Sequence, residues 1–381
     1  MLTKKNICVV ATVPVAIKVF MREHVLRLSE QYSVVLVCTG AQEELESIFS
    51  GYDVRCIALD IERKISIWDD LKSLFKLRRI FVEEHFDAVH SLMPKAGLLA
   101  MLAARLARVP VRVHIFTGQV WSTATGIKRL VLKVMDQVLS LCATHLLADS
   151  PSQRAFLVDE HVVAAEKISV LGLGSISGVD SARFRPDNGA RAQTRAQFSI
   201  PDDALVFLFM ARMTRAKGAL DMAQAFALFA KSAPSAHLLM VGPDEDGIEA
   251  ELADLLADAG GRFHRVGFTD KPESYMAASD VFCLPSYREG FSLATIQAAG
   301  AGLPAVASRI YGLTDAVAEG VTGLMHEPGD IPAIVECMLR LHADAAFREQ
   351  LATAARIRAH QYFSQEYIVG EMAKFYAGVL A

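Results

Sequence analysis

The 381-residue sequence lacks the features that mark several special classes of protein. Its six cysteines are scattered, with no C-x-x-C pair and no dense spacing. We therefore expect free, mostly buried thiols in a reducing compartment, and neither a structural zinc site nor a disulfide framework. The sequence has no low-complexity tract, and 52% apolar with 22% charged residues is the composition of an ordinary folded protein.

Long uninterrupted apolar runs are also missing. The stretch AGLLAMLAARLARVPV is broken by arginine before it reaches the ~18 residues that a membrane span needs. The segment MLTKKNICVVATVP has two lysines before an apolar run, as a signal peptide does, but the run is short, β-rich and without a small-residue cleavage site. We expect a first strand there and no transmembrane helix.

The sequence has no strong excess of either charge, but its net charge of −4 is unevenly distributed. Residues 1–175 contain 21 Lys and Arg against 18 Asp and Glu, whereas the remainder contains 18 against 25. The segment LKSLFKLRRIF places Lys72, Lys76, Arg78 and Arg79 among apolar residues, and GIKRLVLKV repeats the pattern. Such helices can be solvated surface helices or lie on an anionic membrane, and their clustering in one half favours a membrane-facing first domain.

Short β-rich segments alternate with longer helical ones, which is typical of parallel sheets covered by helices on both faces. The expected strands of the first half are residues 6–13, 33–39, 53–59, 87–92, 111–117, 145–150 and 168–172. Those of the second half are residues 205–213, 237–242, 262–268, 281–286, 304–308 and 323–328. In the second half we expect helices from about Ala219, Ile248 and Leu293.

A chain of this length is large enough for two domains. The segment Gly172–Pro186 is rich in glycine and serine and ends in proline, so it is the expected linker. We predict an α/β fold of two Rossmann-like domains, residues 1–175 and 176–358, with parallel sheets facing a central cleft. Ligands are expected at the carboxyl ends of the strands. A closing helical segment, residues 359–381, would pass back over the first domain.

Two motifs of the second half predict a site for a nucleotide diphosphate carrying a sugar. MARMTRAKG places Arg212 and Lys217 after an expected strand and near a helix start, where two cations and free amides suit a diphosphate. Taken alone, these residues are more simply two solvated surface cations.

The stretch LPSYREGFSLATIQAAGAGLPAVAS is more specific, because it places an acid, a helix start and an amide in order. Glu289 precedes a helix that opens at about Ser292 and could accept hydrogen bonds from a polyol. The free amides of Ser292 and Leu293 could hold a phosphate, and the adjacent Phe291 is assigned to the same site. Gln297, just over one turn further on, would reach other hydroxyl groups. The alternative is that Glu289 only interacts favourably with the helix dipole and that Gln297 is a solvated surface residue.

With these motifs the chain resembles, over essentially its full length, the retaining glycosyltransferases of family 4, which have the GT-B fold. In that family a glutamate, seven intervening residues and a second glutamate bracket the helix start. The first lies near the donor sugar, and the second binds the ribose diol. Glu289 matches the first position, whereas Gln297 occupies the second. Glutamine lacks charge but still accepts and donates hydrogen bonds, so we expect weakened or altered ribose binding.

The resemblance implies further donor-site and catalytic residues. Arg212 and Lys217 match the basic pair that holds the donor diphosphate, and Phe268 lies in the loop whose backbone contacts the nucleobase. Similar enzymes place a histidine near the donor sugar at a strand end, where VRVHIFTGQVW has His114. A strand-end histidine without that match is more often structural. Arg212, Lys217, Glu289 and His114 are therefore the expected catalytic residues.

The acceptor side is also assigned by resemblance. HSLMPKAGLLAMLAARLARVP and HIFTGQVW together resemble bacterial transferases that assemble capsule, O-antigen or glycan on a polyprenyl-diphosphate lipid. Lys95, at an expected helix start, would meet the acceptor's diphosphate, with Thr117 and Gly118 close by. The resemblance implies a peripheral protein at the cytoplasmic face of the inner membrane. Its partners would be a UDP-sugar and a lipid-linked saccharide, with no nucleic acid.

The expected chemistry is transfer with retention, from a hexose or N-acetylhexosamine donor. The sequence has no well-placed carboxylate pair for double displacement, which favours a front-side mechanism in which the leaving diphosphate helps to deprotonate the acceptor. Asp244 and Asp246 form an Asp-x-Asp, but they are expected in a solvated acidic turn. We expect no metal and no cofactor.

Three alternatives remain open because a fold does not fix a function. A sugar-nucleotide epimerase would bind the same donor and need no lipid. A glycan phosphorylase would need a lysine-bound pyridoxal cofactor. An inactive UDP-sugar-binding scaffold is suggested by Gln297.

Overall fold

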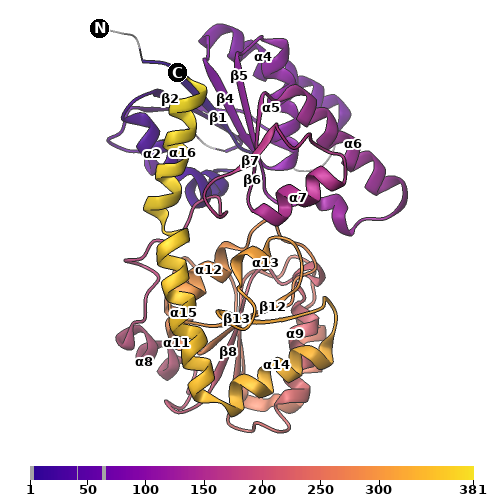
Figure 1. Cartoon of the computed structure of the whole chain (residues 1–381), viewed down its shortest axis with the longest axis vertical. Coiled ribbons are helices and arrows are strands. Elements are labelled where there is room, and N and C mark those ends of the chain that lie inside the picture. Colours follow the sequence, from indigo (N-terminus) through magenta and orange to yellow (C-terminus); the bar gives the residue numbers. More distant parts are fainter. Residues whose placement is uncertain (1–3, 41, 62–65) are drawn as a thin grey trace. The chain divides into compact units, whose positions relative to one another are not determined.

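A computed structural model of the chain describes residues 4–40, 42–61 and 66–381 (Figure 1). The chain divides into two compact units. Unit 1 consists of Met1–Ser177 together with Gln365–Ala381, and unit 2 consists of Gly178–Ser364. The crossing from unit 1 to unit 2 falls within the glycine- and serine-rich segment Gly172–Pro186.

Unit 1 is built on a seven-stranded parallel sheet in the order β3-β2-β1-β4-β5-β6-β7. All seven strands predicted for the first half are confirmed. Their bounds are β1 Asn6–Val10, β2 Ser33–Cys38, β3 Val54–Ala58, β4 Ala88–Leu92, β5 Val111–Phe116, β6 His145–Ala148 and β7 Ile168–Val170.

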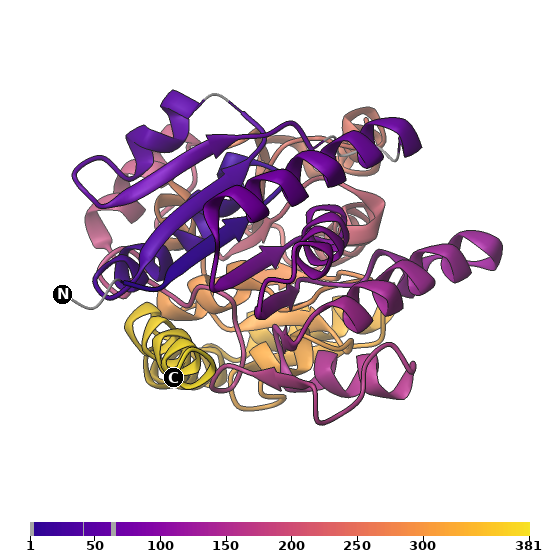
Figure 2. The same ribbon diagram turned by 90° about the horizontal axis from the view of Figure 1, so that it is seen from above.

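Helices cover both faces of this sheet (Figures 1 and 2). Alternate residues of a strand point to opposite faces, so Cys8 packs with one hydrophobic cluster and Ile7 with the other. The helical segments of unit 1 are α1 Pro14–Ala16, η1 Ile17–Met21, α2 Arg22–Ser29, α3 Gln42–Ile48, α4 Ile67–Glu84, α5 Pro94–Leu106, η2 Val120–Thr123, α6 Gly126–Cys142, α7 Pro151–Asp159 and α16 Gln365–Val379.

The last helix, α16, belongs to the core of unit 1. Met372, Tyr376 and Leu380 are buried in the cluster that also contains Ile7, and the Tyr376 hydroxyl lies 2.8 Å from Nδ1 of His90. The expected closing segment 359–381 begins inside the preceding helix, α15 Ala345–Phe363, and the break lies at Ser364, whose φ of −61° and ψ of 144° are extended. No glycine or proline marks this break in the sequence.

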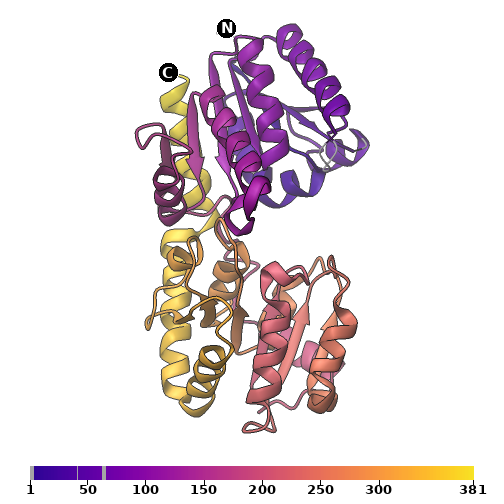
Figure 3. The ribbon, with the colours of Figure 1, turned by 90° about the vertical axis from the view of Figure 1, so that its right-hand side faces the viewer.

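Unit 2 has a six-stranded parallel sheet in the order β10-β9-β8-β11-β12-β13. All six strands predicted for the second half are confirmed, and helices flank the sheet (Figure 3). The strands are β8 Val206–Met210, β9 His237–Val241, β10 Phe263–Val266, β11 Val281–Leu284, β12 Ala305–Ser308 and β13 Gly323–His326.

The helical segments of unit 2 share one hydrophobic core with the sheet. They are α8 Asn188–Gln197, η3 Arg215–Lys217, α9 Ala219–Phe229, α10 Glu249–Leu255, η4 Ala257–Arg262, α11 Pro272–Ala278, α12 Leu293–Gly300, α13 Leu313–Ala316, α14 Ile331–Ala343 and α15. The helices expected from about Ala219, Ile248 and Leu293 are therefore present, with Ile248 capping α10.

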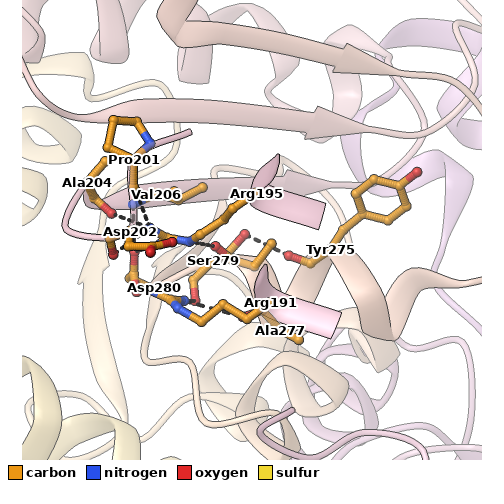
Figure 4. A network of polar contacts seen from close by, with 11 residues as sticks. Arg191, Arg195, Pro201, Asp202, Ala204, Val206, Tyr275, Ala277, Ser279 and Asp280 are labelled. Carbon is orange, nitrogen blue, oxygen red and sulfur yellow. Dashed lines mark hydrogen bonds and ion pairs between the residues drawn. The ribbon is translucent and has the colours of Figure 1, made fainter. Parts of the chain in front are cut away.

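A buried arginine ties together the amino ends of the central strands of unit 2 (Figure 4). Arg195, on α8, is 1% exposed. It donates to the carbonyls of Pro201, Asp202, Ala204 and Ala278 at 2.8–3.0 Å and to the Asp280 carboxylate at 2.9 Å. The same carboxylate accepts from the first amide of β8, at Val206, at 2.7 Å. This network fixes the edge of the sheet opposite to the one where ligands are expected.

All six cysteines are free thiols, five of them buried and Cys337 half-buried. Among the described residues, no helix is both long enough and apolar enough to span a bilayer.

Candidate active site

When the strands of each unit are numbered from its first strand, the first six lie in the order 3-2-1-4-5-6 in both sheets. This order is typical of doubly wound nucleotide-binding sheets. In such sheets ligands bind beyond the carboxyl ends of the two strands at which the order reverses. In unit 2 these strands are β8 and β11, which are neighbours. The loop after β8 carries Arg212 and Lys217, and the loop after β11 carries Glu289, so both predicted motifs lie at the expected edge.

The two loops are in direct backbone contact. Gly218 has a φ of 71°, and a Cβ built on it would lie 1.9 Å from the carbonyl oxygen of Pro285, so only glycine fits. The amide of Tyr287 donates to the carbonyl of Ala216 at 2.9 Å. The glycine in MARMTRAKG therefore permits the close approach that brings the two motifs together.

The centre of this site is an ion pair between two of the four predicted catalytic residues, Lys217 and Glu289. Nζ of Lys217 lies 2.6 Å from Oε1 of Glu289, and only 19% and 9% of the two side chains are exposed. The pair holds the Glu289 carboxylate in one place with its charge balanced. A bound diphosphate would compete for Lys217, which would leave Glu289 able to accept hydrogen bonds from a sugar.

Arg212 is less constrained. Its guanidinium pairs with Glu245 at 2.7 Å, and 50% of the side chain is exposed. Because exposed ion pairs contribute little energy, Arg212 can leave Glu245 for a phosphate at small cost.

The start of α12 differs in detail from the prediction. Ser292 is the N-cap, and its Oγ accepts from the Thr295 amide at 3.3 Å, so this side chain stabilises its own helix. The helix begins at Leu293, and the backbone amides of its first turn have no acceptors within the helix. Phe291 packs against the core, with its ring centroid 5.3 Å from that of Phe363, so only its backbone is suited to a ligand contact. Gln297 is half-buried, one turn along the helix.

Arg288 is a candidate that the sequence reasoning missed. It directly precedes Glu289 and is half-buried, and burial lowers the pKa of its guanidinium, which also interacts with Tyr311 and Arg212. Among the described residues no hydrogen bond or ion pair holds this side chain. A half-buried cation beside Arg212 and Glu289 is suited to an anionic ligand. The sequence signal was an arginine inside the turn YREGF.

Phe268, assigned to the nucleobase, follows β10 and has 77% of its surface exposed.

The two carboxylates of the Asp-x-Asp turn stabilise local backbone structure by accepting hydrogen bonds from main-chain amides. Asp244 accepts from the amides of Gly247, Ile248 and Glu249 at the start of α10, and Asp246 accepts from the amide of Arg215. Over residues 4–40, 42–61 and 66–381 no group of three or more His, Cys, Asp or Glu side chains could hold a metal ion.

In unit 1, Lys95 lies in the first turn of α5, directly after β4, and β4 with β1 forms the corresponding reversal of strand order. Its Nζ pairs with Asp70 of α4 at 2.6 Å, with 13% and 21% of the side chains exposed. Thr117 and Gly118 follow the end of β5, where Gly118 has a φ of 102°. These three residues therefore lie at the carboxyl edge, as predicted for an acceptor site.

His114 was predicted at a strand end near the donor sugar, but the structure buries its side chain in unit 1. His114 lies inside β5, two residues before its end, and is 2% exposed. Its Nδ1 shares a hydrogen bond with Ser91 at 2.9 Å, and a Cβ on Gly97 would lie 2.4 Å from the ring. Burial, with a contribution from His90, lowers the pKa of His114 to about 3. It is a neutral histidine of the core.

The loop with Thr117 and Gly118 is anchored by a buried tryptophan. The indole of Trp121 donates to Oδ2 of Asp136 on α6 at 2.7 Å and stacks on Phe156 with ring centroids 5.2 Å apart. Burial raises the pKa of Asp136 to about 6, although the indole hydrogen bond acts in the opposite direction.

Comparisons with known proteins agree with this geometry. The family model "Glycosyl transferase 4-like domain" matches residues 16–174, and "Glycosyl transferases group 1" matches residues 190–358. The chain is 29% identical over 319 residues to the capsular polysaccharide biosynthesis glycosyltransferase CapM of Staphylococcus aureus, covering 84% of this chain and 83% of CapM.

Two further similarities are informative. The chain is 28% identical over 336 residues to the UDP-Gal:alpha-D-GlcNAc-diphosphoundecaprenol alpha-1,3-galactosyltransferase of Escherichia coli, covering 86% of this chain and 84% of that enzyme. Its fold is similar to the crystal structure of HepE of Anabaena in complex with UDP and glucose. The TM-score is 0.83 at 17% identity, with 98% of this chain and 100% of HepE covered.

Two Rossmann-like units with parallel sheets, matched over nearly the whole chain by such a structure, define the GT-B fold. The two family models cover one unit each, and similarity to named glycosyltransferases extends across both. The chain therefore belongs to the glycosyltransferases, with a 4-like domain followed by a group 1 domain.

Proposed function

We propose that the protein is a retaining glycosyltransferase that moves a hexose or N-acetylhexosamine from a UDP-sugar to a polyprenyl-diphosphate-linked saccharide. It would act in bacterial surface polysaccharide or glycan assembly, at the cytoplasmic face of the inner membrane. The observation that carries the proposal is the Lys217–Glu289 pair at the strand-order reversal of unit 2, beside the start of α12. The names of the CapM and Escherichia coli relatives support the reaction class and the kind of acceptor.

In the proposed reaction the donor diphosphate binds Arg212, Lys217, Arg288 and the first amides of α12. These groups stabilise the negative charge that develops as the bond to the sugar breaks, and preorganised donors of this kind commonly supply the largest catalytic term. Glu289, released from Lys217, accepts hydrogen bonds from the sugar. The leaving diphosphate takes the proton of the acceptor hydroxyl on the same face. No metal is required, because these cations supply the positive charge.

Buried and neutral, His114 supports β5 instead of reacting. On the acceptor side, Lys95, Thr117 and Gly118 would hold the diphosphate of the lipid. Gln297 would contact the ribose through its uncharged amide side chain.

The test uses purified protein, a lipid extract of bacterial membranes and labelled UDP-sugars supplied one at a time. We expect label from one donor to enter the organic phase. Lys217→Ala should abolish most of this transfer, as expected for loss of an important electrostatic contact to the transition state, roughly 10²–10³-fold. Arg309→Ala is the matched control and should retain full transfer, because it breaks only exposed pairs of the same unit, with Glu319 at 3.0 Å and with Glu327 at 3.3 Å.

Other outcomes point elsewhere. Near-normal turnover by folded Lys217→Ala would remove the assigned role of this residue. A changed sugar released without lipid would indicate an epimerase, and pyridoxal absorbance a phosphorylase. Tight UDP binding with no transfer from any donor would indicate an inactive scaffold.

A further inference from the structure

The turn that carries Arg288 and Glu289 is fastened to the loop after β8. Ser286 is fully buried, and its Oγ donates to the carbonyl of Ala216 at 3.2 Å and accepts from the amide of Arg288 at 3.3 Å. The amide of Tyr287 donates to the same carbonyl of Ala216 at 2.9 Å. These bonds fix the backbone as far as Arg288, whereas Glu289 lies one residue beyond them.

The side chain of Tyr287 makes a further contact with unit 2. Its hydroxyl forms a hydrogen bond with the carboxylate of Asp221, and burial, this bond and the charge of Asp221 raise the pKa of Tyr287 to about 12. The phenol therefore keeps its proton and donates it to the carboxylate. Asp221 lies in the first turn of α9, which follows Lys217 closely in the sequence. The bond thus joins the turn before α12 to the helix that follows Lys217.

The loop after β13 approaches the same hydroxyl. Gly329 has a φ of 78°, and a Cβ built on it would lie 2.9 Å from the hydroxyl oxygen of Tyr287. A larger residue there would push the phenol aside. Although its hydroxyl is confined in this way, 38% of Tyr287 is exposed, and among the described residues its ring is not part of the hydrophobic core of unit 2. Core packing therefore does not explain this tyrosine.

The carboxylate of Asp221 is a poor structural group in its own right. Over the part of the chain that the structure describes, its Oδ2 is buried and accepts no hydrogen bond. A buried carboxylate oxygen without a donor costs stability, although a place in the first turn of a helix offsets some of that cost. A buried polar atom left without a partner beside a ligand site is consistent with a group that serves the site.

We propose that Asp221 and Tyr287 are positioning residues for Glu289. The carboxylate of Asp221 holds the phenol, and the phenol holds the turn from which Glu289 accepts hydrogen bonds from the donor sugar. Lys217 holds Glu289 directly in the structure, at 2.6 Å. Once a diphosphate draws Lys217 away, the bond between Tyr287 and Asp221 still ties the turn to α9. The inference rests on the proposed function for the role of Glu289.

The test measures binding by calorimetry without acceptor, first of UDP and then of UDP-glucose, UDP-galactose and UDP-N-acetylglucosamine, of which the tightest binder is used. Tyr287→Phe removes only the hydroxyl. We expect it to weaken UDP-sugar binding about tenfold, the effect of losing a hydrogen bond to a charged group. UDP binding should be nearly unchanged, because Ser286 still holds the backbone of Arg288.

Two changes at Asp221 are paired with this variant. Asp221→Asn keeps an acceptor for the hydroxyl of Tyr287 and should bind UDP-sugar as the unchanged protein does. Asp221→Leu removes the acceptor and should match Tyr287→Phe. Tyr275→Phe, which removes a hydroxyl from α11 in the same unit, is the matched control and should bind both ligands normally.

Double variants separate positioning from a purely structural role. Tyr287→Phe/Asp221→Leu replaces both partners with apolar groups, so its midpoint of thermal unfolding should return towards that of the unchanged protein. Its UDP-sugar binding should nevertheless stay as weak as that of either single variant, because one contact has been lost in each case. In a Glu289→Gln background, Tyr287→Phe should cause no further loss, since its effect passes through Glu289.

Three outcomes overturn the proposal. They are unchanged UDP-sugar binding by Tyr287→Phe, an equal loss of UDP and UDP-sugar binding, and recovery of UDP-sugar binding together with thermal stability in the double variant with Asp221→Leu. If the unchanged protein binds none of the three UDP-sugars, both this proposal and the proposed function fail. If the binding differences hold but the unchanged protein transfers no sugar, Asp221 and Tyr287 keep their role and the transferase function is refuted.

Discussion

Arg195 offers the sharpest quantitative test of the unit 2 scaffold. Its guanidinium is 1% exposed, and all three nitrogens donate to fixed acceptors, four of them carbonyls and one the Asp280 carboxylate. Arg195→Leu keeps the helix propensity of α8 but leaves these acceptors without their donor. We expect the change to destabilise unit 2 while the donor site, at the opposite edge of the sheet, remains intact in the folded protein.

The expected loss follows from burial. Breaking a buried ion pair by removing one partner costs about 3–5 kcal/mol. Asp280 keeps the Val206 amide and Arg191, and carbonyls near the surface can bind water, so the lower half of that range is expected. For a unit of this size, ~3–4 kcal/mol lowers the midpoint of thermal unfolding by roughly 6–16 °C.

Arg191→Leu is the matched control, since Arg191 binds the same carboxylate at 2.8 Å but has 31% of its side chain exposed. It should cost only about 1 kcal/mol. Both tryptophans lie in unit 1, so unfolding is followed by circular dichroism and calorimetry, with and without UDP. If the two variants lose stability equally, burial does not set the strength of this network and the reasoning fails.

Four further predictions concern function and pH. Gln297→Glu should tighten UDP binding, measured by calorimetry, by about fivefold, because hydrogen bonds to a charged group are stronger by roughly 1 kcal/mol. Unchanged affinity would place Gln297 away from the ribose. Arg288→Met should weaken UDP binding about tenfold, the value of a charged hydrogen bond of ~1.4 kcal/mol, with unchanged thermal stability; wild-type affinity would show that Arg288 does not contact the donor. Because burial raises the pKa of Asp136 to about 6, the folded state binds this proton more tightly than the unfolded state. Its contribution to stability therefore falls as pH rises from about 4 to about 6; Asp136→Asn should flatten that decline in urea unfolding, and an unaltered pH profile would contradict the assignment. Transfer should persist in excess chelator, and its abolition would show that a metal is needed.

The sequence was sufficient for the architecture because its signals are local. Each of the thirteen strands is a short β-rich segment with breaks on both sides, and each lies within the predicted range. The donor motifs could be predicted equally well, since Lys217 and Glu289 each lie in the segment between a strand and the next long helix. Their 2.6 Å contact joins residues far apart in the sequence and depends on Gly218 meeting Pro285.

Prediction failed where the outcome depended on distant neighbours. His114 looked like a strand-end histidine, but its burial is set by Ser91 on the adjacent strand and Gly97 on α5, which no local pattern reveals. The end of α15 was misplaced because Ser364 is an ordinary residue in an extended conformation. The segments that form α4 and α6 have the periodicity of any amphipathic helix, and only the structure shows that Trp68, Phe75 and Ile127 are exposed.

The chain passes between the units twice, after Ser177 and after Ser364, and this has a consequence for biosynthesis. Unit 2 is one continuous segment, so a nascent chain contains all of it before the last residues of unit 1 are made. The cluster around Ile7 lacks Met372, Tyr376 and Leu380 until α16 has been synthesised, and His90 lacks its tyrosine partner for equally long. Domains usually mature in the order of synthesis. Here unit 2 can complete its fold first, because unit 1 is whole only once α16 has left the ribosome.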